Sequence, residues 1–215
     1  MLKNYFKTAF RNLWRNKGYA SINLLGLAIG LATFILISLY INDELSYDRY
    51  NIKSDRIFMM NEKANWTGKW EISSMTSAPM GPALVRDYPE VENQVRIVPS
   101  FKATLKYKDK AFSEYPNFAD ASIFDIFTLP LVYGQPANML KEKNTVTLSQ
   151  TMSRKLFGNE NPVGKVISFN GDINLRVDGV FEDVPHNSHL QFDVLISFET
   201  LTDESIGWEE DINRW

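Results

Sequence analysis

One uninterrupted apolar run near the N-terminus constrains this chain more than any other feature of its sequence. Residues 22–41 read INLLGLAIGLATFILISLYI and carry no charge. About 20 helical residues, at ~1.5 Å per residue, cross the ~30 Å hydrocarbon core of a bilayer. The apolar region of a cleaved signal peptide is shorter, ~7–15 residues, and ends at small residues, whereas this run ends in Leu39-Tyr40-Ile41. We therefore expect residues 20–41 to form an uncleaved transmembrane helix.

The charges on the two sides of this run differ in sign. Residues 1–19 contain five basic residues and no acidic one, whereas Asp43, Glu44 and Asp48 closely follow the run. Because basic flanks remain on the cytoplasmic side, the N-terminus is predicted to be cytoplasmic and residues 42–215 to lie outside an inner (cytoplasmic) membrane. The outer part contains 18 of the 23 basic residues and all 26 acidic residues.

Two glycines within the run, Gly26 and Gly30, form a G-x-x-x-G pair. Such pairs allow two membrane helices to approach closely, so they are candidates for helix packing. The alternative is that glycine is simply common in membrane helices. The pair alone does not separate these two interpretations.

The segment before the run, residues 1–19, is predicted to form an amphipathic helix. Apolar side chains recur at helical spacing, and this stripe consists of Leu2, Tyr5, Phe6, Ala9, Phe10, Leu13 and Trp14. The basic side chains are expected on the opposite face; they are Lys3, Lys7, Arg11 and Arg15. A basic and aromatic helix can bind nucleic acid, but a membrane span directly after it favours a helix lying in the membrane interface. We expect membrane lipid and no nucleic acid as its partner, with Asn16-Lys17-Gly18 breaking the helix.

The outer part, residues 42–215, alternates between short strands and short helices. The expected strands are 101–107, one after the turn at 108–110, 145–148, 166–169, 173–180 and 190–198. Helical segments are expected at 122–127 and from the capping residue Ser149 to Phe157, with Gly158 as the stop. Asn170-Gly171 predicts a hairpin. Mostly short connections between these elements indicate an α+β fold.

Residues able to perform chemistry are sparse in this sequence. The absence of cysteine excludes disulfides, thiolate metal sites and cysteine nucleophiles. Nucleotide-binding glycine motifs and a G-x-S-x-G nucleophile motif are also absent, so we expect no catalytic residue and no cofactor. His186 and His189 were considered as metal ligands and rejected, because two histidines without a fixed third ligand make an incomplete site and Pro185, Asn187 and Ser188 are turn formers.

The ordered series of motifs resembles a known family over essentially the whole chain. The series comprises KNYFKTAFRNLWRNKGYASINLLGLAIGLATFILISLYINDELSYDRY, YPEVENQVR, SIFDIFTLPLVYGQP, TVTLSQTMSRKLFGNENPVGKVISFNG and LRVDGVFEDVPHNSHLQFDVLISF. These segments are similar to the N-terminal part of an ABC transporter permease of the MacB/FtsX type, namely its first transmembrane helix and a MacB-like periplasmic core domain. The most specific block contains the signature residues Ser149, Phe157, Gly158, Pro162 and Gly164.

The resemblance implies a function and partners. Permeases of this type are not enzymes; they dimerise, as homo- or heterodimers, and pair with a cytoplasmic ATP-binding subunit. ATP-driven motion passes across the bilayer to the periplasmic domain, a process called mechanotransmission, and serves export, lipoprotein release or activation of a periplasmic or outer-membrane partner. Because the family has further spans, we expect the chain to be an N-terminal portion with a core domain that is incomplete at its C-terminus. The alternative is a single-span anchored binding or sensor domain; an anchored hydrolase is less favoured.

Overall fold

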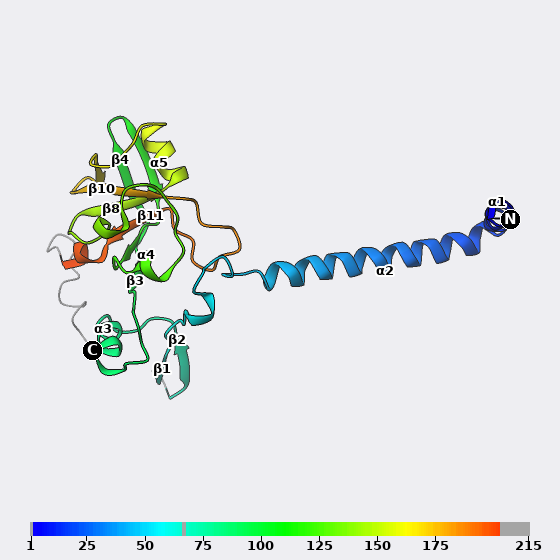
Figure 1. The fold of residues 1–215 in the computed structure, drawn as a ribbon, viewed down its shortest axis with the longest axis horizontal. Coiled ribbons are helices and arrows are strands. Elements are labelled where there is room, and N and C mark those ends of the chain that lie inside the picture. The colour runs from blue at the N-terminus through cyan, green and yellow to red at the C-terminus, as the bar shows by residue number, and fades with distance from the viewer. Residues whose placement is uncertain (1, 66–67, 203–215) are drawn as a thin grey trace. The chain divides into compact units, whose positions relative to one another are not determined.

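The chain forms two compact units, Met1–Tyr47 and Asp48–Trp215 (Figure 1). The structure is a computed structural model that describes residues 2–65 and 68–202. The first unit is helical, and the second is a mixed α+β domain. This confirms the α+β class expected from the sequence. The second unit begins at Asp48 rather than at the predicted residue 42.

Two helices make up the first unit. Helix α1 (Leu2–Arg15) and helix α2 (Lys17–Glu44) are separated only by Asn16, whose φ and ψ of −113° and 51° break the helical path. Figure 1 shows α1 nearly end-on at the start of α2, so the two helices run in different directions. The predicted break at residues 16–18 is confirmed at Asn16 only, because Gly18 lies inside α2.

Helix α2 is longer than the predicted span at residues 20–41. Its 28 residues correspond to about 42 Å at ~1.5 Å per residue, more than a bilayer core requires. By length and composition it is a candidate membrane-spanning helix. None of its side chains is buried within the chain, although most of them are apolar.

A nine-stranded mixed sheet forms the centre of the outer domain. Its hydrogen-bonded order is β3-β6-β11-β8-β10-β9-β4-β5, and β7 pairs separately with β10. The strands are β3 (Ile97–Pro99), β4 (Ala103–Tyr107), β5 (Lys110–Glu114), β6 (Asn117–Ala119), β7 (Leu131–Tyr133), β8 (Thr145–Ser149), β9 (Val166–Phe169), β10 (Ile173–Phe181) and β11 (Val194–Ser197). β8 pairs with β10 and β11 with β6 in parallel, and the other neighbours are antiparallel.

Both faces of the sheet centre are covered. In β11, Val194 and Ile196 belong to one buried cluster and Leu195 to another, as the alternation of side chains along a strand requires. Every residue of β8 is buried although its sequence, TVTLS, alternates between polar and apolar residues, and the hydroxyls of Thr147 and Ser149 bond to Asp178 and Asp193. Helix α5 (Gln150–Phe157) contributes Met152, Leu156 and Phe157 to the first cluster.

Several elements expected from the sequence are confirmed. The structure has a short helix α4 (Ile123–Ile126), and the loop between β9 and β10 contains Asn170 and Gly171, both at positive φ. The predicted strand at 190–198 is wrong in its bounds, because only Val194–Ser197 is a strand. Hydrogen bonds from the side chains of Ser188 and Gln191 hold the preceding loop in another conformation.

The part of the outer domain between Asp48 and the central sheet was not predicted from the sequence. It contains the short helix η1 (Ser54–Arg56), the hairpin β1 (Glu62–Asn65) and β2 (Trp70–Ser73), and the helix α3 (Met80–Asp87). Apolar side chains here are largely exposed: Phe58 is 86% exposed and Met75 81%. Few of these residues therefore contribute to the two buried clusters.

Candidate functional site

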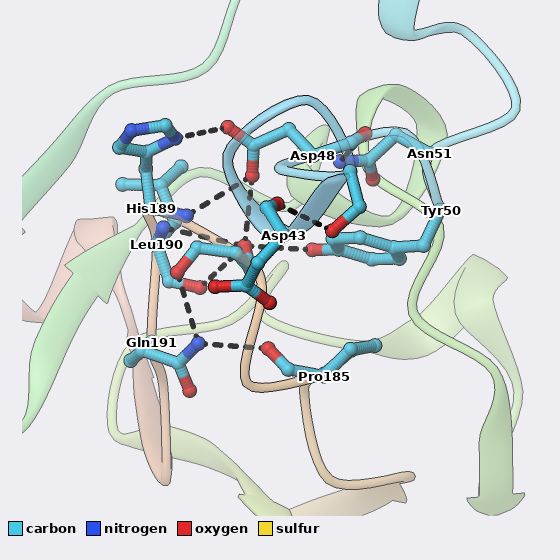
Figure 2. Close-up of polar contacts among 10 residues, drawn as sticks. Asp43, Asp48, Tyr50, Asn51, Pro185, His189, Leu190 and Gln191 are labelled. Atoms are coloured by element: carbon cyan, nitrogen blue, oxygen red, sulfur yellow. Dashed lines mark hydrogen bonds and ion pairs between the residues drawn. The ribbon is translucent and has the colours of Figure 1, made fainter. Parts of the chain in front are cut away.

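The candidate functional site lies where the chain enters the outer domain, four residues after the end of α2. Residues 48–51 contact the loop 185–191, which leads from β10 to β11, and we call this contact the clasp. Figure 2 shows its side chains pointing toward one another from two segments that are about 140 residues apart in sequence. All residues of the clasp belong to the outer domain.

Asp48 is the centre of the clasp. Its backbone N–H donates to the carbonyl of Asn187 at 2.9 Å, and its Oδ1 accepts from the backbone N–H of His189 at 3.1 Å. Its Oδ2 lies 2.6 Å from His189 Nδ1. Asp48 has a φ of 57°, a left-handed conformation that aspartate tolerates better than most residues. This turn directs both the backbone and the carboxylate of Asp48 toward the loop.

Ser188 completes the polar contacts of the clasp. Its side chain is buried, and its hydroxyl donates to Asp48 Oδ1 at 3.0 Å. The same oxygen accepts from the backbone N–H of Leu190 at 3.3 Å and lies 3.2 Å from the hydroxyl of Tyr50. The single proton of this hydroxyl therefore faces two acceptors, Asp48 Oδ1 and the carbonyl of Leu190, both at 3.0 Å. Replacement of Ser188 therefore affects both sides of the clasp.

Asn51 extends the clasp to the segment that follows α4 (Ile123–Ile126). It is buried, and its Oδ1 accepts from the backbone N–H of Thr128 at 2.9 Å. The hydroxyl of Thr128 in turn accepts from the backbone N–H of Ile52 at 2.9 Å. This reciprocal pair satisfies two backbone donors. The entering segment is thus held at two places, the 185–191 loop and the segment after α4.

The residues on either side of the 185–191 loop, Asp183 and Asp193, are bonded to the start of α5. Ser149 Oγ donates to Asp193 Oδ1 at 2.7 Å and accepts from the backbone N–H of Met152, so Ser149 is both the N-cap of α5 and a partner of the loop. At the loop's other end, Asp183 accepts from the N–H and the hydroxyl of Thr151 at 2.8 and 2.7 Å. Short polar contacts therefore hold both ends of the segment between β10 and β11 against the start of α5.

The electrostatics of Asp48 favour its charged form. Partial burial on its own raises the pKa of this carboxyl, but hydrogen bonds from His189 and Ser188 outweigh burial and the pKa of Asp48 is lowered. Asp48 is therefore a carboxylate at neutral pH. When His189 is protonated, the contact at 2.6 Å is an ion pair; when it is neutral, the contact is a hydrogen bond.

The clasp positions the segment that enters the outer domain against the 185–191 loop. Within residues 2–65 and 68–202, no group of three or more His, Asp or Glu side chains is placed to hold a metal ion. His189, considered and rejected as a metal ligand on sequence grounds, contacts Asp48. Sequence reasoning missed Asp48, Tyr50 and Asn51 as partners of this loop. Their polar character directly after an apolar helix was visible, but their pairing depends on the tertiary fold.

The family-signature residues lie around α5 and the turn that follows it. Gly158, at a φ of 70°, is the C-cap of α5, and the ring of Phe157 lies 4.4 Å from that of Tyr107. Pro162 is buried, and Gly164, at a φ of 85°, donates to the carbonyl of Val177 at 2.8 Å. The signature thus shapes one end of the domain core, and only Ser149 touches the loop that carries the clasp.

The residues predicted to contact the membrane all lie in the helical unit. The aromatic side chains of Phe6, Phe10 and Trp14 and the basic side chains of Lys7, Arg11 and Arg15 line a single hollow on α1, so the basic residues lie beside the aromatic stripe rather than opposite it. The predicted anchor Tyr5 is also exposed. An added Cβ at Gly26 or Gly30 would meet no atom within 4 Å, so both glycines are open to a neighbouring helix.

Comparisons with known proteins agree with this architecture. The family described as MacB-like periplasmic core domain matches residues 20–213. A domain of a protein described as a permease from Porphyromonas gingivalis is 26% identical with a TM-score of 0.58, and the match covers 68% of this chain and 60% of that one. Among curated proteins, no sequence matches this chain.

Two further solved structures resemble the chain over about half its length. One is the extracellular domain of the noncanonic ABC-type transporter YknZ from Gram-positive bacteria, at 24% identity and a TM-score of 0.42, covering 53% of this chain and 58% of that one. The other is the periplasmic region of MacB from Actinobacillus actinomycetemcomitans, at 22% identity and a TM-score of 0.41, covering 54% and 56%.

Proposed function

Because the chain belongs to the MacB-like periplasmic core domain family, we propose that it is the N-terminal portion of a mechanotransmission permease of an ABC transporter. In this proposal α2 crosses the inner membrane with α1 on the cytoplasmic side and the outer domain in the periplasm. A separate cytoplasmic subunit hydrolyses ATP, and the permease itself performs no catalysis. The outer domain moves in response and serves export, lipoprotein release or activation of a periplasmic or outer-membrane partner.

The clasp is the observation that carries this proposal. A domain that is only anchored needs no specific contact behind its membrane helix, because a flexible linker would suffice. Here residues 48–51 are held to the rest of the outer domain by Asp48, Asn51 and Tyr50 through contacts of 2.6–3.2 Å. In this proposal, a movement of α2 that displaces Asp48 would act on the 185–191 loop and, through the neighbouring Asp193 and Asp183, on β11 and α5.

A pair of permeases is part of the proposal. The face of α2 that carries Gly26 and Gly30 would contact a helix of the second permease, because small residues allow close backbone approach where lipid offers no hydrophobic driving force. The exposed basic and aromatic α1 would lie in the cytoplasmic interface, next to the ATP-binding subunit. Both placements are predictions from the exposure of these residues in the single chain.

Affinity purification from native membranes tests the proposed function. The tagged full-length permease that contains this chain is extracted in mild detergent, and the co-purifying proteins are identified by mass spectrometry. We expect a P-loop ATPase in stoichiometric amount, lost when the membranes are first washed with a denaturant that strips peripheral proteins. Recovery of the permease with no ATPase, but with a bound periplasmic molecule, would favour an anchored binding or sensor domain instead.

A further inference from the structure

Helix α1 combines aromatic and basic side chains in one hollow. Phe6, Phe10 and Trp14 form its apolar surface, with the rings of Phe10 and Trp14 6.1 Å apart, and the cations of Lys7, Arg11 and Arg15 form its edge. Cations placed at the border of an apolar stripe can extend toward the aqueous side while their aliphatic stems cover apolar surface. This is the arrangement required by a ligand with apolar chains and an anionic head.

A second groove lies at the bend between α1 and α2. It is lined by apolar and small side chains from both helices, with a single cation, and its residues are Phe10, Leu13, Trp14, Lys17, Ala20, Ser21 and Leu24. The Nζ of Lys17 lies 5.0 Å from the centre of the Trp14 ring. The apolar surface of α1 therefore continues into the start of the membrane helix with a cation at the junction, and Trp14 belongs to both hollows.

The cations of this helix lack acidic partners in the part of the chain that the structure describes. No ion pair there involves Lys7, Arg11, Arg15 or Lys17, and the first carboxylate along the sequence is Asp43, at the far end of α2. In the outer domain, by contrast, Arg96, Lys155 and Arg176 each pair with a carboxylate. The positive charge of α1 is thus available to an external anion.

We propose that α1 and its bend with α2 bind anionic phospholipids selectively, with the headgroups on Lys7, Arg11, Arg15 and Lys17 and the acyl chains against Phe10 and Trp14. The inference rests on the proposed membrane location of α1 and names the lipid class that this helix recognises. An acidic protein surface would match the charges but would leave three large exposed side chains, Phe6, Phe10 and Trp14, without an apolar environment. A bilayer with anionic headgroups matches both features.

The size of the effect follows from the number of cations. Each Lys or Arg near an anionic membrane surface favours association by about fivefold, the equivalent of about 1 kcal/mol. Neutralising three of the four cations should therefore remove most of the local enrichment of anionic lipid and leave the contribution of Lys17. The attraction acts over about one Debye length, so high salt should reduce the enrichment as well.

Fluorescence quenching of Trp14 in nanodiscs tests the proposal. The full chain is prepared with its other tryptophans, Trp66, Trp70, Trp208 and Trp215, replaced by Phe, so that only Trp14 emits. It is reconstituted in equal parts of phosphatidylcholine and phosphatidylglycerol, with brominated acyl chains on either one lipid or the other. We expect brominated phosphatidylglycerol to quench Trp14 several-fold more strongly than brominated phosphatidylcholine.

Two matched variants separate α1 from the overall charge. In the triple variant Lys7→Gln/Arg11→Gln/Arg15→Gln, Trp14 should lose most of its preferential quenching by brominated phosphatidylglycerol, with Lys17 retained. The variant Lys102→Gln/Lys106→Gln/Lys108→Gln removes the same charge from exposed positions of the outer domain and should keep the preference. Raising the salt concentration for the protein with all its cations should weaken the lipid preference in the same way, without any change to the helix.

Two results would overturn the proposal. Equal quenching by both lipids at low salt would mean that α1 lies in the interface without lipid selectivity. An absence of quenching by either lipid would mean that Trp14 lies outside the acyl region, as it would against an acidic protein surface. Neither result bears on the ATPase found by purification, so a failure of this inference is distinguishable from a failure of the proposed function.

Discussion

The carboxylate of Asp48 accepts hydrogen bonds from the backbone N–H of His189 and contacts the imidazole of the same residue, at 3.1 and 2.6 Å. Asp48 lies four residues beyond the end of α2 and His189 lies five residues before β11, so this pair joins the start of the outer domain to the segment that precedes a central strand. Loss of the pair should have consequences for stability and for coupling.

The first prediction concerns the energetic coupling of this pair. Asp48→Asn and His189→Ala should each lower the free energy of unfolding of the outer domain by about 1 kcal/mol, because a charge-assisted hydrogen bond is lost but the site is partly exposed. The double variant should lose less than the sum of the two changes. Urea unfolding of the full chain in detergent measures all three, with Asp109→Asn, at an exposed turn, as the control. Additive losses would show that the pair is not coupled.

The second prediction concerns the pH dependence of the clasp. The pKa of Asp48 is lowered in the folded chain, so the unfolded chain binds a proton more readily than the folded chain. The stabilisation by Asp48 is therefore complete above the ordinary carboxyl pKa of 3.8 and is lost as pH falls through the lowered pKa. The difference in the free energy of unfolding between wild type and Asp48→Asn should be constant at mildly acidic pH and should shrink once the pH falls below the ordinary carboxyl pKa. A difference that grows on acidification would contradict the assignment.

The third prediction concerns Asp178 on β10, where the sign is opposite. Burial raises the pKa of Asp178 in spite of hydrogen bonds from the hydroxyl of Thr147 and the N–H of Leu140, both at 2.7 Å. Its contribution to stability is therefore complete below the ordinary pKa and declines as pH rises through the raised pKa. Relative to Asp178→Asn, wild type should lose stability across this window. Relative to Asp172→Asn, which changes an exposed loop carboxylate, wild type should show no such decline.

The fourth prediction separates backbone strain from steric contact at two glycines. Both Gly134 and Gly164 have positive φ, at 98° and 85°, but a Cβ at Gly134 would lie 2.6 Å from the backbone oxygen of Asp178 whereas one at Gly164 would meet nothing within 4 Å. Gly164→Ala should cost about 1–2 kcal/mol through strain alone. Gly134→Ala should cost on the order of 3 kcal/mol or more because backbone must also shift. Equal costs in urea unfolding would contradict this account.

The fifth prediction concerns membrane topology. The native chain has no cysteine, so single cysteines at Ser113 and Asn4 report without background. Both positions are exposed, one on the edge strand β5 and one on α1. A membrane-impermeant thiol reagent applied to intact cells with a permeable outer membrane should label Ser113→Cys and not Asn4→Cys. The reverse pattern would invert the proposed orientation.

The sequence predicted those elements whose signals are local. The cap Ser149, the stop Gly158 and the hairpin residues Asn170 and Gly171 depend on nearby backbone geometry, and the structure places each of them as expected. The apolar run at 22–41 likewise needs no tertiary context. The helix extends to Lys17–Glu44, beyond the apolar run. An apolar run does not predict this extension, because the charged residues at the ends of a membrane helix can lie outside the hydrocarbon core.

The clasp could not be predicted because it depends on long-range pairing. Nothing near Asp48 in sequence indicates His189 as its partner, and His186 and His189 at close spacing invited a metal hypothesis instead. The loop 190–193 alternates like a strand, yet bonds of Ser188 and Gln191 to the backbone hold it as a loop. The basic residues of α1 were expected opposite the aromatic stripe, but they share its hollow, a difference of detail that helical spacing alone does not resolve.

The most direct test of the central claim is the response of the clasp loop to nucleotide. Hydrogen exchange of backbone amides 186–193 is measured in the permease bound to its ATPase, with and without vanadate-trapped nucleotide. We predict a nucleotide-dependent change in wild type and in Asp109→Asn that is lost in the Asp48→Asn/His189→Ala variant, while the ATPase remains bound and active. The same nucleotide-dependent change in the clasp variant would contradict transmission through Asp48 and His189.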